Sequence, residues 1–244
     1  IPITKKHSML GIFIRILLCL VVVFILVVAG VYFSSRLSVS RLRIEAPTTD
    51  YLVLVNWENP VTSVPTDLVP VSDVMNNDIV IADNGHMIDR IAGTAAGKMF
   101  EAASQDGIGK FIINNAYRSV ETQAVIWQNR IDQDPAYGRD PYNNPVKAMP
   151  GDKSEHSTGL AIDILCENYN SADEAFGETA EGKWLAENAH NFGFILRYPK
   201  DKQSVTGVIY EPWHFRYVGI NAATEIYEQG LCLEEYLKEN KSSE

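Results

Sequence analysis

A chain of 244 residues with 46% hydrophobic side chains and a formal net charge of −10 is long enough to bury a sizeable core. The acidic excess argues against a nucleic acid as partner, because surfaces that bind nucleic acids are rich in lysine and arginine. The cysteines, Cys19, Cys166 and Cys232, are too few for a disulfide framework, and the sequence leaves open whether Cys166 and Cys232 pair.

The N-terminal part of the sequence predicts a membrane anchor. Residues 16–33 form an uncharged apolar run of 18 residues, which is close to the minimum for a membrane-spanning helix. A cleaved signal peptide is the alternative, but its apolar region is normally shorter and ends at a small-residue cleavage site, which residues 28–33 match poorly. We therefore expect a cytoplasmic N-terminus over 1–15, one uncleaved transmembrane helix over 16–33, a linker over 34–50 and a folded domain over 51–244.

The folded domain mixes strand and helix patterns. The predicted elements in chain order are a strand over 51–56, a hairpin of strands 78–82 and 86–88 around Asn84-Gly85, a helix over 89–105, a strand over 111–113, a helix over 123–131 capped by Ser119, a strand over 160–165, a helix over 179–191, three strands over 194–198, 205–210 and 213–218, and two short helices over 222–228 and 232–239. The three closely spaced strands predict an antiparallel meander. The mixture predicts an α+β fold, with helices packed on a mainly antiparallel sheet.

A first candidate site follows a long loop over 133–153 that is rich in proline and glycine, and such loops are often functional. Residues 154–163 read SEHSTGLAID. His156 by itself is more often a surface residue than a ligand. Asp163, however, lies in an otherwise apolar strand, where a charge is costly unless it is paired or bound to a metal. A salt bridge or a buried cap is the structural alternative for Asp163.

A second candidate site lies in residues 211–217, EPWHFRY. Trp213 and Phe215 flank His214, and strand alternation predicts these two rings on one face and His214 on the other. Glu211 and His214 would face opposite ways in a straight strand, so we expect a bend at the intervening proline that brings both to one site.

Together the two segments hold the parts of a zinc peptidase site. A catalytic zinc takes three nitrogen or oxygen ligands from the protein and keeps one position open. It also needs a nearby carboxylate that does not bind the metal and can take a proton from water. The imidazoles of His156 and His214 and the carboxylates of Asp163 and Glu211 can supply all of these groups.

A third candidate lies at Tyr117-Arg118-Ser119, which follows a predicted strand. The forked guanidinium of Arg118 suits a substrate carboxylate or an oxyanion beside a metal. Gln123, one helical turn further on, would add an amide contact. A surface ion pair is the alternative reading of Arg118.

These segments resemble the VanY group of zinc D-alanyl-D-alanine carboxypeptidases, relatives of VanX with a hedgehog-like fold. The resemblance covers roughly residues 50–238 and includes GFILRYP at 193–199. It implies that His156, Asp163 and His214 bind one Zn²⁺. It also implies that Glu211 is the catalytic base and that Arg118 holds the scissile carbonyl or the terminal carboxylate. The residues that line the substrate cleft would be Tyr117, Arg118, Gln123 and Ser154.

The resemblance further implies that the substrate is a peptidoglycan stem pentapeptide, whose C-terminal D-Ala is removed in glycopeptide resistance or cell-wall remodelling. Stem peptides lie outside the cell, so we expect a single-pass protein of the cell membrane with an extracellular catalytic domain. An L,D-carboxypeptidase that trims tetrapeptides to tripeptides is the main alternative. An inactive hedgehog-like binding module is disfavoured by Glu211, and a soluble phage-type endopeptidase by residues 16–33. The sequence leaves the oligomeric state open.

Overall fold

The computed structural model describes residues 50–82 and 85–241. Asp50–Glu244 forms one compact unit. The predicted transmembrane helix over 16–33 lies outside the described residues, as does the rest of the chain before residue 50. Within the described ranges, no helix is long and apolar enough to cross a membrane.

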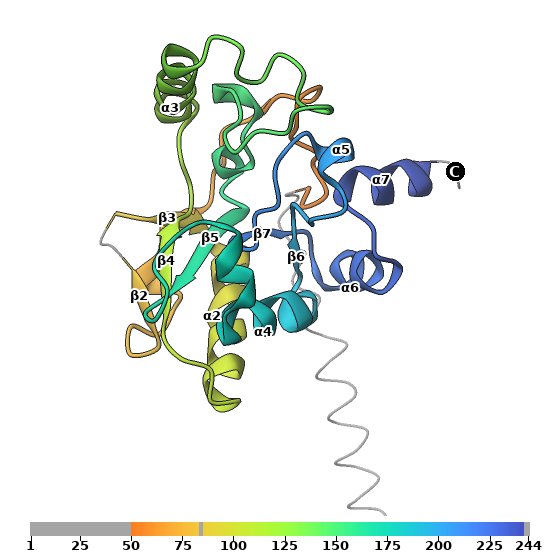
Figure 1. The fold of residues 1–244 in the computed structure, drawn as a ribbon. Helices are drawn as coiled ribbons and strands as arrows, with labels where there is room; N and C mark the ends of the chain where they lie inside the picture. The colour runs from red at the N-terminus through yellow and green to blue at the C-terminus, as the bar shows by residue number, and fades with distance from the viewer. Residues whose placement is uncertain (1–49, 83–84, 242–244) are drawn as a thin grey trace, which may run out of the picture. The chain divides into compact units, whose positions relative to one another are not determined.

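A five-stranded sheet with the strand order β2-β4-β5-β7-β6 positions the candidate site (Figure 1). Its strands are β2 (Val80–Ala82), β4 (Phe111–Asn115), β5 (Ala161–Cys166), β6 (Phe194–Leu196) and β7 (His214–Tyr217). Only the β2–β4 pair among them is parallel. The sheet is therefore mixed and mainly antiparallel, and the α+β prediction is confirmed. A separate two-stranded sheet pairs β1 (Leu68–Pro70) with β3 (Met87–Asp89).

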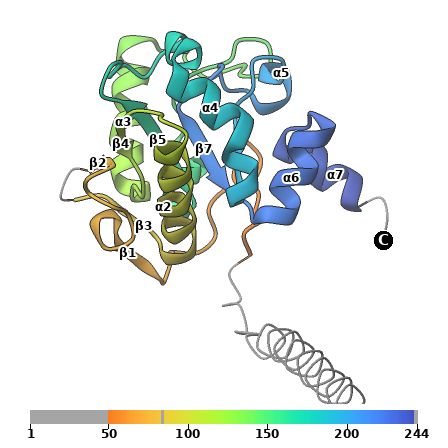
Figure 2. The same ribbon diagram turned by 90° about the horizontal axis from the view of Figure 1, so that it is seen from below.

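The described part of the chain has helices on one face and at one edge of the sheet, and others outside this layer. They are α2 (Arg90–Gln105), α3 (Val120–Gln133), α4 (Ala180–Asn188), α5 (Gln203–Thr206), α6 (Ile220–Gln229) and α7 (Leu233–Lys241), with short 3-10 turns that include η2 (Gly151–Lys153), η3 (Glu155–Thr158) and η5 (Ala189–Phe192). Figures 1 and 2 show α2 and α4 on one face of the sheet and α6 and α7 beside the β6 edge. The helix α3 stands away from this layer, at the top of Figure 1.

The helix ends follow from capping groups that the sequence supplies. The Asp89 carboxylate accepts hydrogen bonds from the Ile91 and Ala92 N–H groups, both at 3.0 Å, and so begins α2. Ser119 Oγ accepts from the Thr122 N–H at 3.2 Å and begins α3, as predicted. The main core lies between α2 and the sheet, where Phe100 and Phe111 are fully buried.

Three predicted strand features are wrong. The strands on either side of Asn84-Gly85 do not form a hairpin, because β2 pairs with β4 and β3 pairs with β1. A local turn preference thus loses to pairing with distant strands that bury Val80 and Ile88. Residues 51–56 form no strand and begin in a turn, in which the Val53 N–H donates to Asp50 O at 3.2 Å.

The predicted middle strand of the meander, 205–210, is also absent. Val205 lies in α5, which ends at Gly207 with φ +71°, and Val208 makes only an isolated bridge with Val146. The outer two strands of the predicted meander therefore pair directly, as β6 and β7. Cys166 and Cys232 are buried free thiols, which answers the open question of their pairing.

Candidate active site

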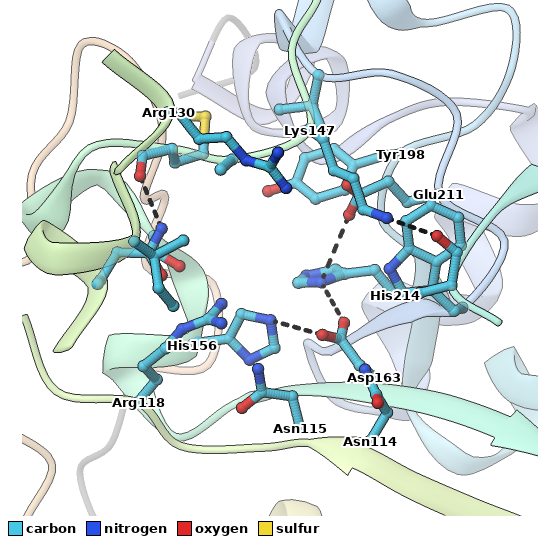
Figure 3. A pocket seen from close by; sticks show the side chains of 18 residues that line it. Asn114, Asn115, Arg118, Arg130, Lys147, His156, Asp163, Tyr198, Glu211 and His214 are labelled. Atoms are coloured by element: carbon cyan, nitrogen blue, oxygen red, sulfur yellow. Dashed lines mark hydrogen bonds and ion pairs between the residues drawn. The ribbon is translucent and has the colours of Figure 1, made fainter. Parts of the chain in front are cut away.

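A pocket of about 230 Å³ opens where β4, β5 and β7 meet the helix α3 and the long loop before η2 (Figure 3). The predicted site residues that line it are Arg118, Gln123, Ser154, His156, Asp163, Glu211 and His214. The structure thus brings together residues that are far apart in the sequence. Tyr117 is the exception, because it does not line the pocket and its N–H donates to Met87 O at 2.7 Å. Its predicted substrate contact is not supported.

Three of these residues offer donor atoms to one point. His156, Asp163 and His214 are buried, and one ligand atom from each lies within 4.8 Å of the other two. Asp163 and His214 stand directly opposite each other in the β5–β7 register. His156 Nε2 is 3.3 Å from Asp163 Oδ2, and His214 Nδ1 is 3.0 Å from Asp163 Oδ1. Figure 3 shows the carboxylate between the two rings.

The donor set fits Zn²⁺, which favours imidazole nitrogens and a carboxylate oxygen. His156 turns Nδ1 toward Ala116 O at 2.7 Å, so a proton on Nδ1 leaves Nε2 free to bind a metal. The predicted metal group is therefore present as a set of buried donors.

Local backbone geometry places His156 next to the sheet. The turn η3 ends at Gly159, whose φ of +75° is a left-handed conformation that favours glycine. A Cβ at this position would also stand 2.7 Å from a side-chain carbon of Leu68. The chain then enters β5, whose residues are all buried. Asp163 is thus the one charged residue in a fully buried strand.

The predicted bend at Pro212 is present. The His214 N–H donates to Glu211 O at 3.1 Å, and Glu211 Oε2 lies 3.9 Å from His214 Nδ1. Glu211 is therefore beside the metal donors without belonging to their group. The pKa of Glu211 is raised to about 8, mainly by burial; the positive charge of His214 acts against this rise and the negative charge of Asp163 adds to it. Such a pKa suits a group that takes and returns a proton near neutral pH.

The rings that flank His214 both lie in the main core, as predicted, although Trp213 also reaches the pocket. Phe215 is fully buried in the core. Trp213 is also buried in this core, but it lies in the turn before β7 and lines the pocket together with His214. Strand alternation does not apply to Trp213 because the bend begins before the strand.

Arg118 and Gln123 present unused polar atoms. Arg118 Nε and Gln123 Oε1 are buried and have no hydrogen-bond partner within the described part of the chain. Gln123 Nε2 donates to Met149 O at 2.7 Å, which fixes the amide and leaves its oxygen free. Burial lowers the pKa of Arg118, while the charges of Asp163 and Glu211 act against this. The Arg118 Nε–H is therefore available to donate a hydrogen bond to a ligand, and Gln123 Oε1 is available to accept one.

Sequence reasoning missed several lining residues, among them Arg130, Lys147 and Tyr198. Figure 3 shows Arg130 and Lys147 across the pocket from His156. Lys147 Nζ donates to Ala172 O at 2.5 Å and stands 4.7 Å above the Trp213 ring. A signal for Arg130 existed, because a residue two helical turns after Gln123 shares its helix face. Lys147 lies in the long loop that already indicated function.

The side-chain charges make the pocket suited to an anionic ligand. Arg118, Arg130 and Lys147 line it, although the whole chain carries a net charge of −10. Cations that gather in a cleft of an acidic protein favour negatively charged groups there. Three nitrogen and oxygen donors with an adjacent carboxylate are the parts of a metal-dependent hydrolase site, and the cations around them favour a ligand with a negative charge.

The comparisons with known proteins give the family. The family model described as "VanY: D-alanyl-D-alanine carboxypeptidase" matches residues 85–220, which contain all the predicted site residues. The chain therefore belongs to the VanY family, and the predicted resemblance is confirmed. The D-alanyl-D-alanine carboxypeptidase of Enterococcus faecalis (strain ATCC 700802 / V583) is 40% identical over 196 residues, with 78% of this chain and 66% of that protein covered. The chain thus spans about two thirds of that relative.

Solved structures agree with the fold. The LdcB LD-carboxypeptidase is 36% identical with a TM-score of 0.68, and the match covers 77% of this chain and 86% of that one. The vancomycin resistance D,D-pentapeptidase VanY, solved as a mutant in complex with Zn(II), is 38% identical with a TM-score of 0.61, and the match covers 78% of this chain and 99% of that one. One of these two similar proteins is thus named as an LD-carboxypeptidase and the other as a D,D-pentapeptidase.

Proposed function

We propose that this protein is a zinc-dependent carboxypeptidase that removes the C-terminal D-Ala from peptidoglycan stem pentapeptides. The observation that carries the proposal is the buried group of His156, Asp163 and His214 with Glu211 beside it. All four residues are present, which argues against an inactive binding module. The likeness to a D,D-pentapeptidase that holds Zn(II) supports both the metal and the substrate class.

The residues of this chain take defined parts in the hydrolysis. His156 Nε2, the Asp163 carboxylate and His214 Nδ1 would hold Zn²⁺, which supplies a Lewis acid that polarises the scissile carbonyl and makes water more acidic. Glu211 takes a proton from the attacking water at its carboxylate and passes that proton to the nitrogen of the departing D-Ala. The bond between that nitrogen and the carbonyl carbon then breaks.

The polar groups around the metal position the substrate. Arg118 donates from its unpartnered Nε to the scissile carbonyl oxygen or to the terminal carboxylate. Gln123 Oε1 accepts a backbone N–H of the peptide, since it has no other partner in the described ranges. Met149, which lies in the same loop as Lys147, fixes the Gln123 amide through its carbonyl oxygen. Ser154 lines the same pocket and is buried.

A second candidate is the L,D-carboxypeptidase activity, which removes D-Ala from a tetrapeptide. The likeness to the LdcB LD-carboxypeptidase favours it. The same metal and base serve both reactions, and only the residue before the scissile bond differs in chirality. The two activities are therefore separated by substrate and not by mechanism.

The test is incubation of the zinc-loaded chain with purified stem tetrapeptides and pentapeptides, followed by mass spectrometry. Conversion of pentapeptide to tetrapeptide supports the D,D-activity, and conversion of tetrapeptide to tripeptide supports the L,D-activity. Zinc-loaded chain that cleaves neither peptide overturns the proposal. The Glu211→Gln variant is the control for a contaminating peptidase.

We infer that the activity serves glycopeptide resistance or cell-wall remodelling. Removal of the terminal D-Ala destroys the D-Ala-D-Ala group that glycopeptides bind, and the similar VanY comes from a vancomycin resistance cassette. Expression of the natural chain in a glycopeptide-sensitive host should raise the inhibitory concentration of the glycopeptide. Expression of the Glu211→Gln variant should not. Equal inhibitory concentrations for the two proteins would restrict the function to remodelling.

We also infer that the catalytic domain lies outside the cell and is anchored by residues 16–33. The apolar run and the location of stem peptides support this placement. Protease added to cells without a wall should digest the bulk of the chain and leave a small membrane-protected fragment. A full-size protected chain would place the domain inside the cell, and release of active protein into the medium would identify 16–33 as a cleaved signal.

A further inference from the structure

Glu155 is a buried carboxylate next to the metal donors that the proposed mechanism does not use. Its side chain is 0% exposed. Its Oε1 accepts two hydrogen bonds, from Arg197 Nε and from Arg216 Nη1, each at 2.8 Å. Both guanidinium groups are themselves buried. One oxygen of Glu155 is therefore enough to meet the two arginines.

The second oxygen of Glu155 faces His214. Glu155 Oε2 and His214 Nε2 are both buried without a hydrogen-bond partner in the described part of the chain. They lie 3.8 Å apart. Because alternate residues of a strand share a face, His214 and Arg216 project from β7 to the same side, toward this carboxylate. An acceptor and a donor that lack other partners thus face each other.

This arrangement matters for the metal because of the histidine tautomer. His214 turns Nδ1 toward Asp163, at 3.0 Å from Oδ1, so Nδ1 is the nitrogen available to the metal. A neutral imidazole that gives Nδ1 to a metal carries its proton on Nε2. Metal-binding histidines commonly donate this other N–H to a carboxylate or a carbonyl. His156 meets the rule through Ala116 O at 2.7 Å.

We propose that Glu155 is the positioning residue of His214, with Oε2 accepting the Nε2–H and thereby holding the ring in the tautomer and orientation that present Nδ1 to Zn²⁺. The inference rests on the zinc site of the proposed function. A purely structural role of Glu155 would be satisfied by Oε1 alone. The orientation of Oε2 toward His214 is the feature that such a role does not explain.

The carboxylate is held from two distant parts of the chain. Arg197 Nη1 and Nη2 donate to both oxygens of Glu234 in α7, at 2.8 and 2.7 Å. Arg216 Nη2 donates to Tyr51 O at 3.1 Å and to Val53 O at 2.8 Å. The start of the domain and its C-terminal helix therefore fix the arginines that fix Glu155. Residues 51–56 were predicted to form a strand, but two of their carbonyl groups accept hydrogen bonds from the Arg216 guanidinium and not from another strand.

The test is Zn²⁺ affinity of the full chain, measured without substrate by competition with a chromophoric chelator. In Glu155→Gln the amide oxygen faces the two guanidiniums, since an NH₂ group there would meet only donors. The NH₂ group then faces His214 Nε2 and favours a proton on Nδ1, which blocks the metal. We expect Zn²⁺ affinity to fall about 10- to 100-fold, the usual effect of removing an outer partner of a metal ligand.

A matched control is Glu181→Gln, which makes the same change at a buried glutamate of α4 that does not line the pocket. It should bind Zn²⁺ like the natural chain. Folded Glu155→Gln that binds Zn²⁺ equally well overturns the inference. If the natural chain itself binds no Zn²⁺, the proposed function fails, so the two failures are distinguishable.

A second measurement remains decisive if Glu155→Gln does not fold. Imidazole NMR of the zinc-loaded natural chain should show His214 protonated on Nε2, with that proton exchanging slowly because a buried carboxylate holds it. His214 protonated on Nδ1, or an Nε2 proton in fast exchange with water, overturns the inference.

Discussion

The two walls of the pocket are built in different ways. The metal-binding wall comes from β5 and β7, whose residues are all buried and whose backbones pair directly, and from the buried His156 of η3. The opposite wall comes from α3 and the loop over 133–153, and Gln123 is the only buried residue of α3. Arg130 and Lys147 on this second wall are exposed.

The difference between the two walls matches the difference between binding a metal and recognising a substrate. Metal donors must keep their geometry to within fractions of an ångström, which a paired and buried strand provides. Side chains that recognise a substrate tolerate adjustment, and they commonly lie on loops that a rigid scaffold holds. We therefore expect changes in the metal-binding wall to abolish turnover, and changes in the opposite wall to alter substrate affinity.

The largest effect should follow from loss of a metal donor. His156→Ala, Asp163→Ala and His214→Ala each leave two of the three ligands, so none should retain stoichiometric zinc or activity. Metal analysis of the purified variants checks this. Full zinc retention in a folded variant would remove that residue from the ligand set.

Glu211→Gln should separate the base from the ligands. The amide keeps the size of the side chain but cannot accept the proton, so turnover should fall by roughly two or more orders of magnitude while zinc stays bound. Metal content and kcat measured on the same preparation decide it. Loss of zinc with an intact fold would make Glu211 a ligand.

Lys147→Met should test the opposite wall. The change keeps much of the length of the side chain and removes its charge, so KM for the stem peptide should rise several-fold, roughly 1 kcal/mol, with kcat nearly unchanged. Lys183→Met is the matched control, because Lys183 is exposed, lies on α4 and pairs with Glu178. A fall in kcat at constant KM would give Lys147 a part in the chemistry.

The smallest effect concerns how the stability of the metal-free fold depends on pH. Burial alone would lower the pKa of His214, but the neighbouring carboxylates of Asp163 and Glu155 raise it to about 9, and burial raises the pKa of Glu211 to about 8. Both groups hold protons more tightly in the folded state than in the unfolded one. Their stabilisation is therefore complete below their unfolded pKa values of about 6.5 and 4.5, and it is lost as pH rises through the folded values.

The melting temperature of the metal-free chain should accordingly be several degrees lower at pH 9 than at pH 7, since about 1 kcal/mol shifts it by roughly 2–4 °C in a domain of this size. Excess Zn²⁺ should remove this fall, because deprotonated His214 binds the metal. A melting temperature that rises from pH 7 to 9 without metal would contradict the raised pKa values.

The sequence by itself determined the features that depend on neighbouring residues. The cap at Ser119 and the bend at Pro212 follow from short-range chemistry, and the charge of Asp163 in an apolar strand indicated a ligand before any contact was known. The family resemblance supplied the ligand roles.

Only the tertiary structure decided which distant segments meet. The hairpin at Asn84-Gly85 failed because pairing partners are chosen by burial across the whole sheet, and the turn signal contains no information about β1 or β4. Glu155 gave no signal either, since its guanidinium partners lie 42 and 61 residues away. A buried ion pair depends on the exclusion of water by the folded core, and no local pattern in the sequence records that exclusion.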